Sequence, residues 1–184
     1  MKILIVYGTT EGQTQKIATF LKDEAITLGH SVKLVNALDE QPSPEGYNMV
    51  FIGASLHAGG YQAAIRHYVQ QHAETLNQLY SVFFSVSLTA AGDDQESWKE
   101  LEEITTEFLH KTGWKPNMVK QIAGALKYTQ YDFFKRFIMR MISKRAGGAT
   151  DTGQDYEYTD WELVKAFLKD ALGRYYEPAK QVAL

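Results

Sequence analysis

Short apolar runs alternate with longer segments of helical periodicity along most of the chain. Lys2–Val6 and Tyr47–Ala54 are almost continuously apolar and are bounded by turn residues, which is typical of strands buried on both faces. Helical segments instead place apolar residues three and four positions apart, as at Ile17, Leu21 and Ala25. The predicted strands are Lys2–Val6, Ser31–Val35, Tyr47–Ala54, Tyr80–Val86 and Lys120–Ala125. The predicted helices are Gln13–Leu28, Tyr61–Leu79, Gln95–Lys111 and a last helix from an N-cap at Thr159 to about Tyr175.

The order of these elements predicts the fold. Strands that alternate with helices form right-handed β-α-β units, so the sheet is parallel and helices cover both of its faces. We predict one α/β domain over residues 1–184, a three-layer α/β/α arrangement around a doubly wound sheet of five parallel strands, with an insert over about residues 126–155. Ligands of such sheets bind at the carboxyl ends of the strands. Three loops are expected there: Gly8–Thr14, Ser55–Gly60 and Ser85–Gly92.

The loop after the first strand carries the first candidate chemistry. Its sequence, GTTEGQT, places two glycines and three threonines between a strand and a helix. Free N–H groups at a helix N-terminus attract anions, and glycines let the backbone approach them closely. With the hydroxyl groups of Thr9, Thr10 and Thr14, the loop suits a phosphate monoester held by neutral donors without a metal. A plain strand-to-helix turn with a threonine cap is the alternative.

Three other phosphate-binding or phosphate-accepting loops do not fit this stretch. A P-loop requires a lysine after its last glycine, and here Gly12 is followed by Gln13. The dinucleotide fingerprint requires G-x-G-x-x-G, whereas Gly8 and Gly12 give G-x-x-x-G. A phosphoacceptor receiver domain requires acidic residues after the first strand to bind magnesium, and Tyr7 stands there instead.

Composition excludes several classes of site and reveals an uneven charge. The 184 residues include no cysteine, so disulfides and thiolate metal sites are excluded. The N-terminal apolar run is too short for a secretory signal, and no stretch approaches the ~20 apolar residues of a membrane-spanning helix, so we expect a cytoplasmic protein. Residues 127–146 carry six basic residues and one acid, against 13 basic and 21 acidic residues elsewhere. This asymmetry predicts a localised contact with an anionic partner.

The basic segment has the pattern of an amphipathic helix. One helical face carries Phe134, Phe137, Ile138, Met141 and Ile142, and the other carries Lys135, Arg136, Arg140, Ser143 and Lys144. This pattern is typical of a helix that lies on an anionic membrane surface. A helix that packs its apolar face on the protein has the same pattern. Nucleic-acid binding is not expected, because nothing else along the chain is strongly basic.

Several motifs together resemble a known family. The residues Ile5-Val6-Tyr7, Thr9, Gly12, Thr14 and Ala18 match the flavodoxin signature for the phosphate of FMN. Further matches cover nearly the whole chain: Ile52-Gly53-Ala54-Ser55, Gly60-Tyr61, Phe84-Ser85-Val86, the stretch IAGALKY over 122–128, Gly147-Gly148, Thr150-Asp151-Thr152 and Tyr158-Thr159-Asp160-Trp161. Together they resemble the flavodoxin-like family of menaquinone-dependent protoporphyrinogen IX dehydrogenases, most specifically in ALKY, the aromatic basic segment and GGATDT.

The resemblance implies a flavodoxin-like fold, an FMN cofactor and the residues that hold it. In this family of heme biosynthesis, FMN takes electrons from protoporphyrinogen IX and passes them to menaquinone or ubiquinone, so no acid–base dyad is expected. The phosphate is expected at Thr9, Thr10, Glu11, Gly12, Gln13 and Thr14. The isoalloxazine ring is expected between two further groups, Ser55, Leu56, His57, Ala58, Gly59 and Gly60, and Ser85, Val86, Ser87 and Leu88. Residues 87–94, SLTAAGDD, are small and acidic where the family pattern is more basic.

Contacts with substrate or membrane are expected in the insert, at Lys127, Tyr128, Tyr131, Phe134, Arg136, Phe137 and Arg140. Its cations pair either with the propionates of a porphyrinogen or with lipid phosphates. The two tyrosines lie near the flavin, line the substrate entrance or pack on the protein. His57 either contacts the flavin or is a solvated loop residue. The resemblance also implies a peripheral position on the inner face of the cell membrane, since the quinone acceptor is dissolved in lipid.

Two other functions share the expected fold and cofactor. One is a flavodoxin-like NAD(P)H:quinone oxidoreductase, and the other is a non-catalytic electron-transfer flavodoxin. The basic segment argues against the carrier, because carriers of this kind usually present an acidic face to their redox partners. Oxidation of NADPH with a soluble quinone distinguishes the reductase.

Overall fold

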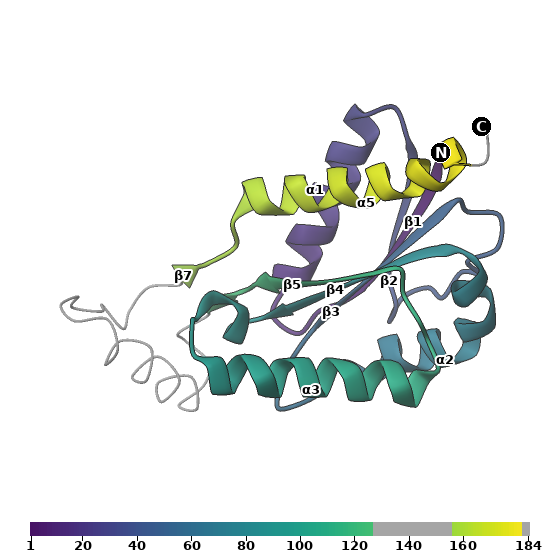
Figure 1. The fold of residues 1–184 in the computed structure, drawn as a ribbon. Coiled ribbons are helices and arrows are strands. Elements are labelled where there is room, and N and C mark those ends of the chain that lie inside the picture. Colours follow the sequence, from purple (N-terminus) through teal and green to yellow (C-terminus); the bar gives the residue numbers. More distant parts are fainter. Residues whose placement is uncertain (127–155, 182–184) are drawn as a thin grey trace.

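A doubly wound parallel sheet forms the centre of the protein. The computed structural model describes residues 1–126 and 156–181 (Figure 1). The five strands run in the order β2-β1-β3-β4-β5, and every neighbouring pair is parallel. Their bounds are β1 Lys2–Gly8, β2 Ser31–Asn36, β3 Met49–Ser55, β4 Tyr80–Ser87 and β5 Met118–Ala123. The order reverses between β1 and β3, as in flavodoxin-like sheets, so the predicted fold class is confirmed.

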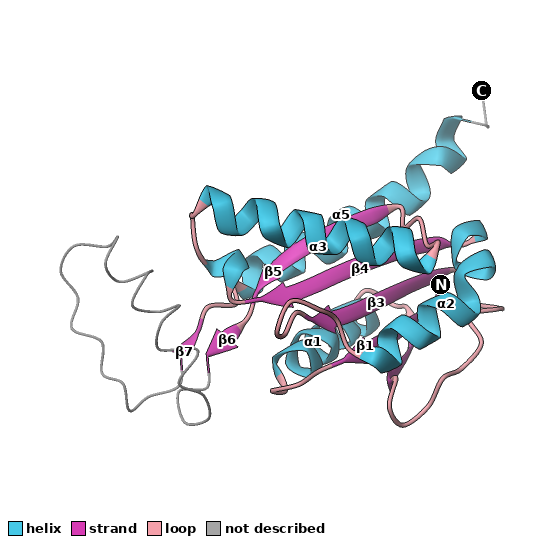
Figure 2. Cartoon of the chain, turned by 90° about the horizontal axis from the view of Figure 1, so that it is seen from below, coloured by secondary structure: helices cyan, strands magenta, loops and turns pink. Residues whose placement is uncertain are grey.

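Two helices cover each face of the sheet (Figures 1 and 2). Helices α1 (Gln13–Thr27) and α5 (Trp161–Gln181) lie on one face, and α2 (Ala63–Gln78) and α3 (Gln95–Thr112) lie on the other. A short 3₁₀ helix, η1 (Thr89–Ala91), follows β4. In the described part of the chain, none of the helices has the length and apolar character needed to cross a bilayer.

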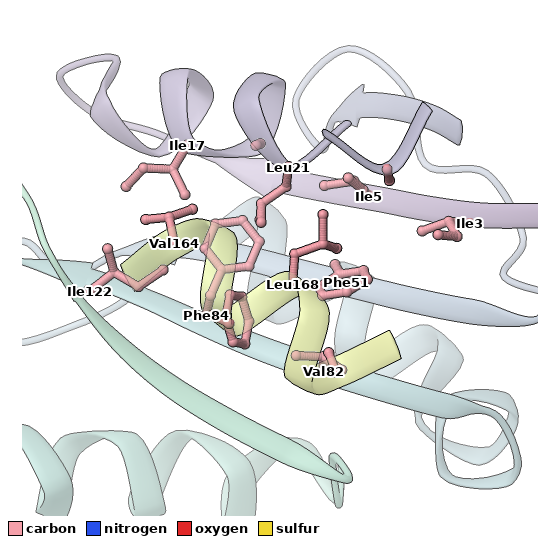
Figure 3. Close-up of a cluster of buried hydrophobic side chains, with 14 of the residues drawn as sticks. Ile3, Ile5, Ile17, Leu21, Phe51, Val82, Phe84, Ile122, Val164 and Leu168 are labelled. Atoms are coloured by element: carbon pink, nitrogen blue, oxygen red, sulfur yellow. The ribbon is translucent and has the colours of Figure 1, made fainter. Parts of the chain in front are cut away.

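Alternate side chains of each central strand enter two separate cores. Ile3 and Ile5 face α1 and α5, where they join Phe84 and Leu168 in the cluster shown in Figure 3. Their neighbours on β1 face α2 and α3 and join the second cluster. Each fully buried side chain of this size contributes about 1.5–3 kcal/mol relative to exposure, so the two cores hold the strand ends in fixed positions.

A second, two-stranded sheet extends beyond β5 and was not predicted. Its strands are β6 (Ala125–Leu126) and β7 (Tyr156–Glu157), which pair antiparallel. The predicted strand Lys120–Ala125 therefore combined the end of β5 with the start of β6, which Gly124 separates. We call β6 and β7 the base hairpin, because the predicted insert lies between them. Residues 127–155 lie outside the described residues, with the sites predicted there: Lys127, Tyr128, Tyr131, Phe134, Arg136, Phe137 and Arg140.

Helix α5 begins one residue later than the capping pattern predicted. The Oδ1 atom of Asp160 accepts a hydrogen bond from the N–H of Leu163 at 3.0 Å, so Asp160 is the N-cap. The predicted N-cap, Thr159, was wrong because its hydroxyl has tertiary partners: its oxygen accepts from Gln13 Nε2 at 2.8 Å, and its O–H donates to the carbonyl oxygen of Ala123 at 2.7 Å. Thr159 therefore fastens the chain before α5 to the end of β5 rather than capping the helix.

Candidate functional site

The three predicted loops meet at one small cavity beyond the carboxyl ends of β1, β3 and β4. The cavity has a volume of about 50 Å³, the size of a small ionic group rather than a nucleotide. It is lined by Thr9, Thr10, Glu11, Gln13, Thr14, Ser55, Leu56, His57, Val86, Leu88, Gly124 and Ala125. Ten of these twelve were predicted as cofactor-binding residues. Gly124 and Ala125 were not, because they follow β5 and only the fold brings them there.

The N-terminus of α1 has no side-chain cap among the described residues. Its N-cap is Gly12, at φ 91°, and no side chain caps the helix. Glycine adopts this left-handed conformation without the cost that a side chain would add. The N–H of Gly12 donates to Thr9 Oγ1 at 2.9 Å, which closes the loop on itself. The first-turn amides of α1 therefore have no side-chain acceptor and can donate to an anion.

Thr14 has an unpaired buried hydroxyl at this end of α1. The residue is fully buried, yet among the described residues its Oγ1 has no hydrogen-bond partner. Leaving a buried polar group unpaired costs about 1–3 kcal/mol. Because Thr14 also lines the cavity, an acceptor oxygen placed there would satisfy its hydroxyl. The uncapped helix and this unpaired donor fit the phosphate group of FMN.

The loop after β3 forms a tight reverse turn beside the cavity. The N–H of His57 donates to the carbonyl oxygen of Gly60 at 3.0 Å, and the N–H of Gly60 donates to that of His57 at 3.1 Å. Ala58 and Gly59, at φ 47° and 78°, make this a type I′ turn. The turn holds His57 and Ala58 at the surface, where both are exposed.

The loop after β4 offers backbone and apolar groups rather than hydroxyls. Ser85 is fully buried, and its hydroxyl accepts from Tyr61 Oη at 2.9 Å. The hydroxyl of Ser87 accepts from the N–H of Ala90 at 3.2 Å. Val86 and Leu88 line the cavity. A ligand at this loop would therefore meet the backbone of Ser85 and Ser87 rather than their side chains.

Gln62 links the first two loops and was not predicted. Its Nε2 donates to Thr10 Oγ1 at 3.0 Å and also to Ser55 Oγ. The hydroxyls of Thr10 and Ser55 lie 3.4 Å apart, so one amide holds both. Gln62 is the N-cap of α2 but accepts no capping hydrogen bond, so no local pattern indicated its role.

Tyr61 anchors the second loop to the structure beneath it. Its hydroxyl, besides donating to Ser85, lies 2.8 Å from Thr105 Oγ1 on α3. Gln121 Nε2 on β5 donates to the same threonine at 2.9 Å. Burial raises the pKa of the Tyr61 hydroxyl above its usual value of 10.0, so it stays protonated as a donor. This buried polar network connects the turn 57–60 with β4, β5 and α3.

A Tyr61→Phe variant is expected to lose about 1–2 kcal/mol of unfolding free energy, because the buried hydroxyls of Ser85 and Thr105 lose a partner. Urea unfolding would measure the loss. Tyr176→Phe is the matched control, since Tyr176 is 46% exposed on α5. Equal unfolding free energies for the two variants would contradict the anchoring role of Tyr61.

A larger groove lies behind the first turn of α1. It has a volume of about 710 Å³ and is bordered by α1, the start of α5 and the base hairpin. The rings of Phe20 and Trp161 lie 5.0 Å apart beside it. Within the described ranges 1–126 and 156–181, neither cavity brings together three side chains that could bind a metal ion.

Sequence comparisons identify the family. A family model described as a flavodoxin domain matches residues 4–153. The protoporphyrinogen IX dehydrogenase (quinone) of Escherichia coli strain K12 is 38% identical over 171 residues, which cover 92% of this chain and 94% of that protein. The protein of the same name from Leishmania major is 36% identical over 181 residues, covering 92% of this chain and 74% of that protein.

A comparison of structures agrees on the fold. The crystal structure of oxidised flavodoxin 1 from Bacillus cereus superposes with a TM-score of 0.57, covering 94% of this chain and 98% of that chain at 12% identity. At such a low identity, this similarity supports the fold alone. The assignment to a family rests on the sequence matches. The chain belongs to the flavodoxin family, within the group of protoporphyrinogen IX dehydrogenases (quinone), and is an oxidoreductase.

Proposed function

We propose that this protein oxidises protoporphyrinogen IX to protoporphyrin IX in heme biosynthesis, with FMN as its cofactor and menaquinone or ubiquinone as its electron acceptor. The observation that carries the proposal is the buried, unpaired hydroxyl of Thr14 at the uncapped end of α1. The chain also matches relatives named protoporphyrinogen IX dehydrogenase (quinone) over 94% and 74% of their lengths. When bound, the flavin supplies the redox chemistry, and the protein binds and orients the reactants.

The phosphate loop would hold FMN through neutral groups. The N–H groups at the start of α1 and the hydroxyls of Thr9, Thr10 and Thr14 are the proposed donors. Gln13 would contribute only its backbone, because its side-chain amide donates to Glu157 and Thr159. No lysine or arginine occurs from residue 8 to residue 14. The helix dipole and the N–H groups would therefore balance the phosphate charge.

The loops after β3 and β4 would flank the isoalloxazine ring. The turn 57–60 is fixed by its two backbone hydrogen bonds, and Gln62 links Ser55, the last residue of β3, to Thr10 of the phosphate loop. Residues 55–60 and 85–88 would therefore contact the ring through backbone groups and the apolar side chains of Leu56, Val86 and Leu88. This arrangement needs no acid or base from the protein.

The basic insert is the proposed contact with membrane and substrate. It would place the protein on the inner face of the cell membrane, on the cytoplasmic side, where a lipid-dissolved quinone is accessible. Lys127, Arg136 and Arg140 would pair with lipid phosphates or with the propionates of the porphyrinogen. The aromatic residues Tyr128, Tyr131, Phe134 and Phe137 would contact the apolar parts of either partner.

Turnover tests the function directly. FMN-loaded protein, kept under anaerobic conditions with protoporphyrinogen IX, should produce the fluorescence of protoporphyrin IX when menaquinone is added and not before. Heat-inactivated protein is the control for uncatalysed oxidation. Oxidation of NADPH by a quinone without formation of protoporphyrin would instead support a NAD(P)H:quinone oxidoreductase.

Sedimentation with vesicles tests the membrane contact. The protein should co-sediment with anionic vesicles, and replacing Arg136 and Arg140 by glutamine should weaken binding by about 2 kcal/mol, or roughly thirtyfold. Lys99→Gln with Lys111→Gln is the charge-matched control, since both lysines are exposed on α3, outside the insert. Equal losses of vesicle affinity in the two double variants would show that binding depends on the overall charge of the protein and not on the insert.

A further inference from the structure

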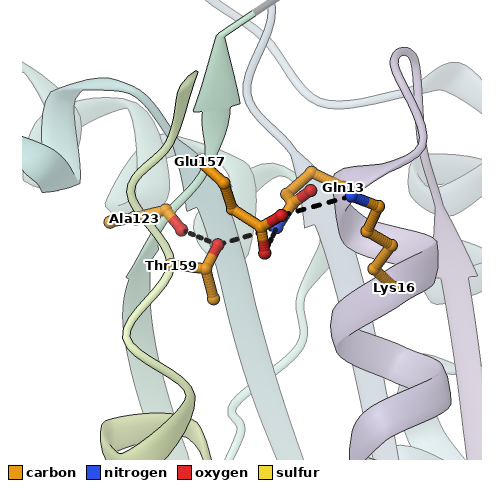
Figure 4. Close-up of polar contacts among 5 residues, drawn as sticks. All are labelled: Gln13, Lys16, Ala123, Glu157 and Thr159. Carbon is orange, nitrogen blue, oxygen red and sulfur yellow. Dashed lines mark hydrogen bonds and ion pairs between the residues drawn. The ribbon is translucent and has the colours of Figure 1, made fainter. Parts of the chain in front are cut away.

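A cluster of polar side chains joins the first turn of α1 to the base hairpin (Figure 4). Gln13 is only 7% exposed, and its Nε2 donates to Glu157 Oε1 at 3.1 Å and to Thr159 Oγ1 at 2.8 Å. Both N–H groups of one amide are thus used on residues more than 140 positions further along the chain. Their geometry fixes where the first turn of α1 lies relative to β7.

Two further contacts fasten the same cluster. Lys16 Nζ lies 3.2 Å from Glu157 Oε2, one helical turn after Gln13, and the hydroxyl of Thr159 donates to the carbonyl oxygen of Ala123 at 2.7 Å. The exposed ion pair contributes little, whereas the buried bond from Gln13 to Thr159 and the partly buried bonds to Glu157 and Ala123 define the arrangement. We call Gln13, Glu157 and Thr159 the clamp.

The clamp and the phosphate site share one helical turn. Gln13 follows the N-cap Gly12 directly, and Thr14, with its unpaired hydroxyl, comes next. The side chain of Gln13 extends to the base hairpin while its backbone N–H belongs to the open end of α1. A phosphate bound at this end needs the first turn held in place, and the clamp supplies that order before binding.

We propose that the clamp couples binding of the cofactor phosphate to the seating of the base hairpin, with Gln13 as the positioning residue. Thermodynamic linkage makes the effect reciprocal: the phosphate stabilises the hairpin as much as the seated hairpin favours the phosphate. The inference rests on the proposed FMN site and is independent of the substrate. It gives the insert, which begins and ends at this hairpin, a physical connection to the cofactor.

The test compares FMN with riboflavin, which has the same ring system without the phosphate. In the wild type, FMN but not riboflavin should slow hydrogen exchange at the amide of Tyr158, which donates to Gly124 at 3.0 Å beside the hairpin. Gln13→Met removes both donors at similar size. It should raise the Kd of FMN about tenfold, leave that of riboflavin unchanged and abolish the FMN-dependent protection.

The matched control is Gln15→Met, a change of the same kind at an exposed position of the same helix, which should behave as wild type. Thr159→Val removes the second partner of Gln13 without a change of charge and should have the same effects as Gln13→Met. It serves as the test variant if Gln13→Met fails to fold. Equal losses of affinity for FMN and riboflavin, or protection by FMN that persists in Gln13→Met, would overturn the coupling. A wild type that binds FMN but does not oxidise protoporphyrinogen IX would contradict only the proposed substrate.

Discussion

A Gly53→Ala variant is expected to lose about 3 kcal/mol of unfolding free energy, because the added methyl group has no room. A Cβ at this position would lie 2.0 Å from Cζ and 2.3 Å from Cε2 of Phe84. Phe84 is fully buried and packs edge-on against Phe167 of α5. The ring of Phe84 cannot move away without displacing α5 from the sheet. Gly53 itself lies two residues before the end of β3, where the strand leads into the site.

Urea unfolding measures this loss, and Gly173→Ala is the control. Gly173 lies within α5, and a Cβ there would meet no atom within 4 Å. Alanine favours a helix interior over glycine by about 1 kcal/mol, so the control should gain stability. A Gly53→Ala protein as stable as wild type would contradict the close packing of β3 against Phe84.

A Thr14→Val variant is expected to change cofactor affinity and stability in opposite directions. The hydroxyl of Thr14 would donate to the charged phosphate, and loss of such a bond should raise the Kd of FMN by about 10- to 100-fold. The same hydroxyl is buried without a partner in the described residues, so its replacement by a methyl group should stabilise the FMN-free protein by about 1 kcal/mol.

Flavin fluorescence titration and urea unfolding without FMN measure the two effects. The control is Thr27→Val at the end of α1, where the hydroxyl donates to the carbonyl oxygen of Asp23 on the surface. This control should leave the Kd of FMN unchanged. An FMN-free Thr14→Val protein less stable than wild type, with unchanged FMN affinity, would show that Thr14 serves the fold and not a ligand.

The parts of the site that local sequence determines were predicted well. The strand, glycine turn and helix around Gly12 follow from neighbouring residues, because the turn conformation and the helix start depend on the chain itself. The order of apolar runs predicts the parallel sheet for a similar reason, since β-α-β connections have one hand. The fold then brings the three loops to one cavity, as expected from the reversal of strand order.

Features that depend on distant partners were not predictable. The two strands of the base hairpin have two residues each and are far apart in the chain, so they are too short to show the alternating apolar pattern of a strand. Gln13 was predicted to bind the cofactor phosphate, but the bonds of its side chain to Glu157 and Thr159, 144 and 146 positions away, could not be foreseen. The bond from Gln13 to Thr159 also explains the error at Thr159, whose hydroxyl oxygen accepts from this distant residue instead of capping α5. Gln62 likewise acts through Ser55 and Thr10, which only the fold brings near it.

The most direct measurement of the central claim is anaerobic mixing of FMN-loaded protein with protoporphyrinogen IX, followed through the absorbance of the oxidised flavin. The proposed function predicts that the band bleaches on mixing and returns when menaquinone is added. A flavin that stays oxidised, in a protein that binds FMN tightly, would contradict the proposed substrate and leave the fold and the cofactor site in place.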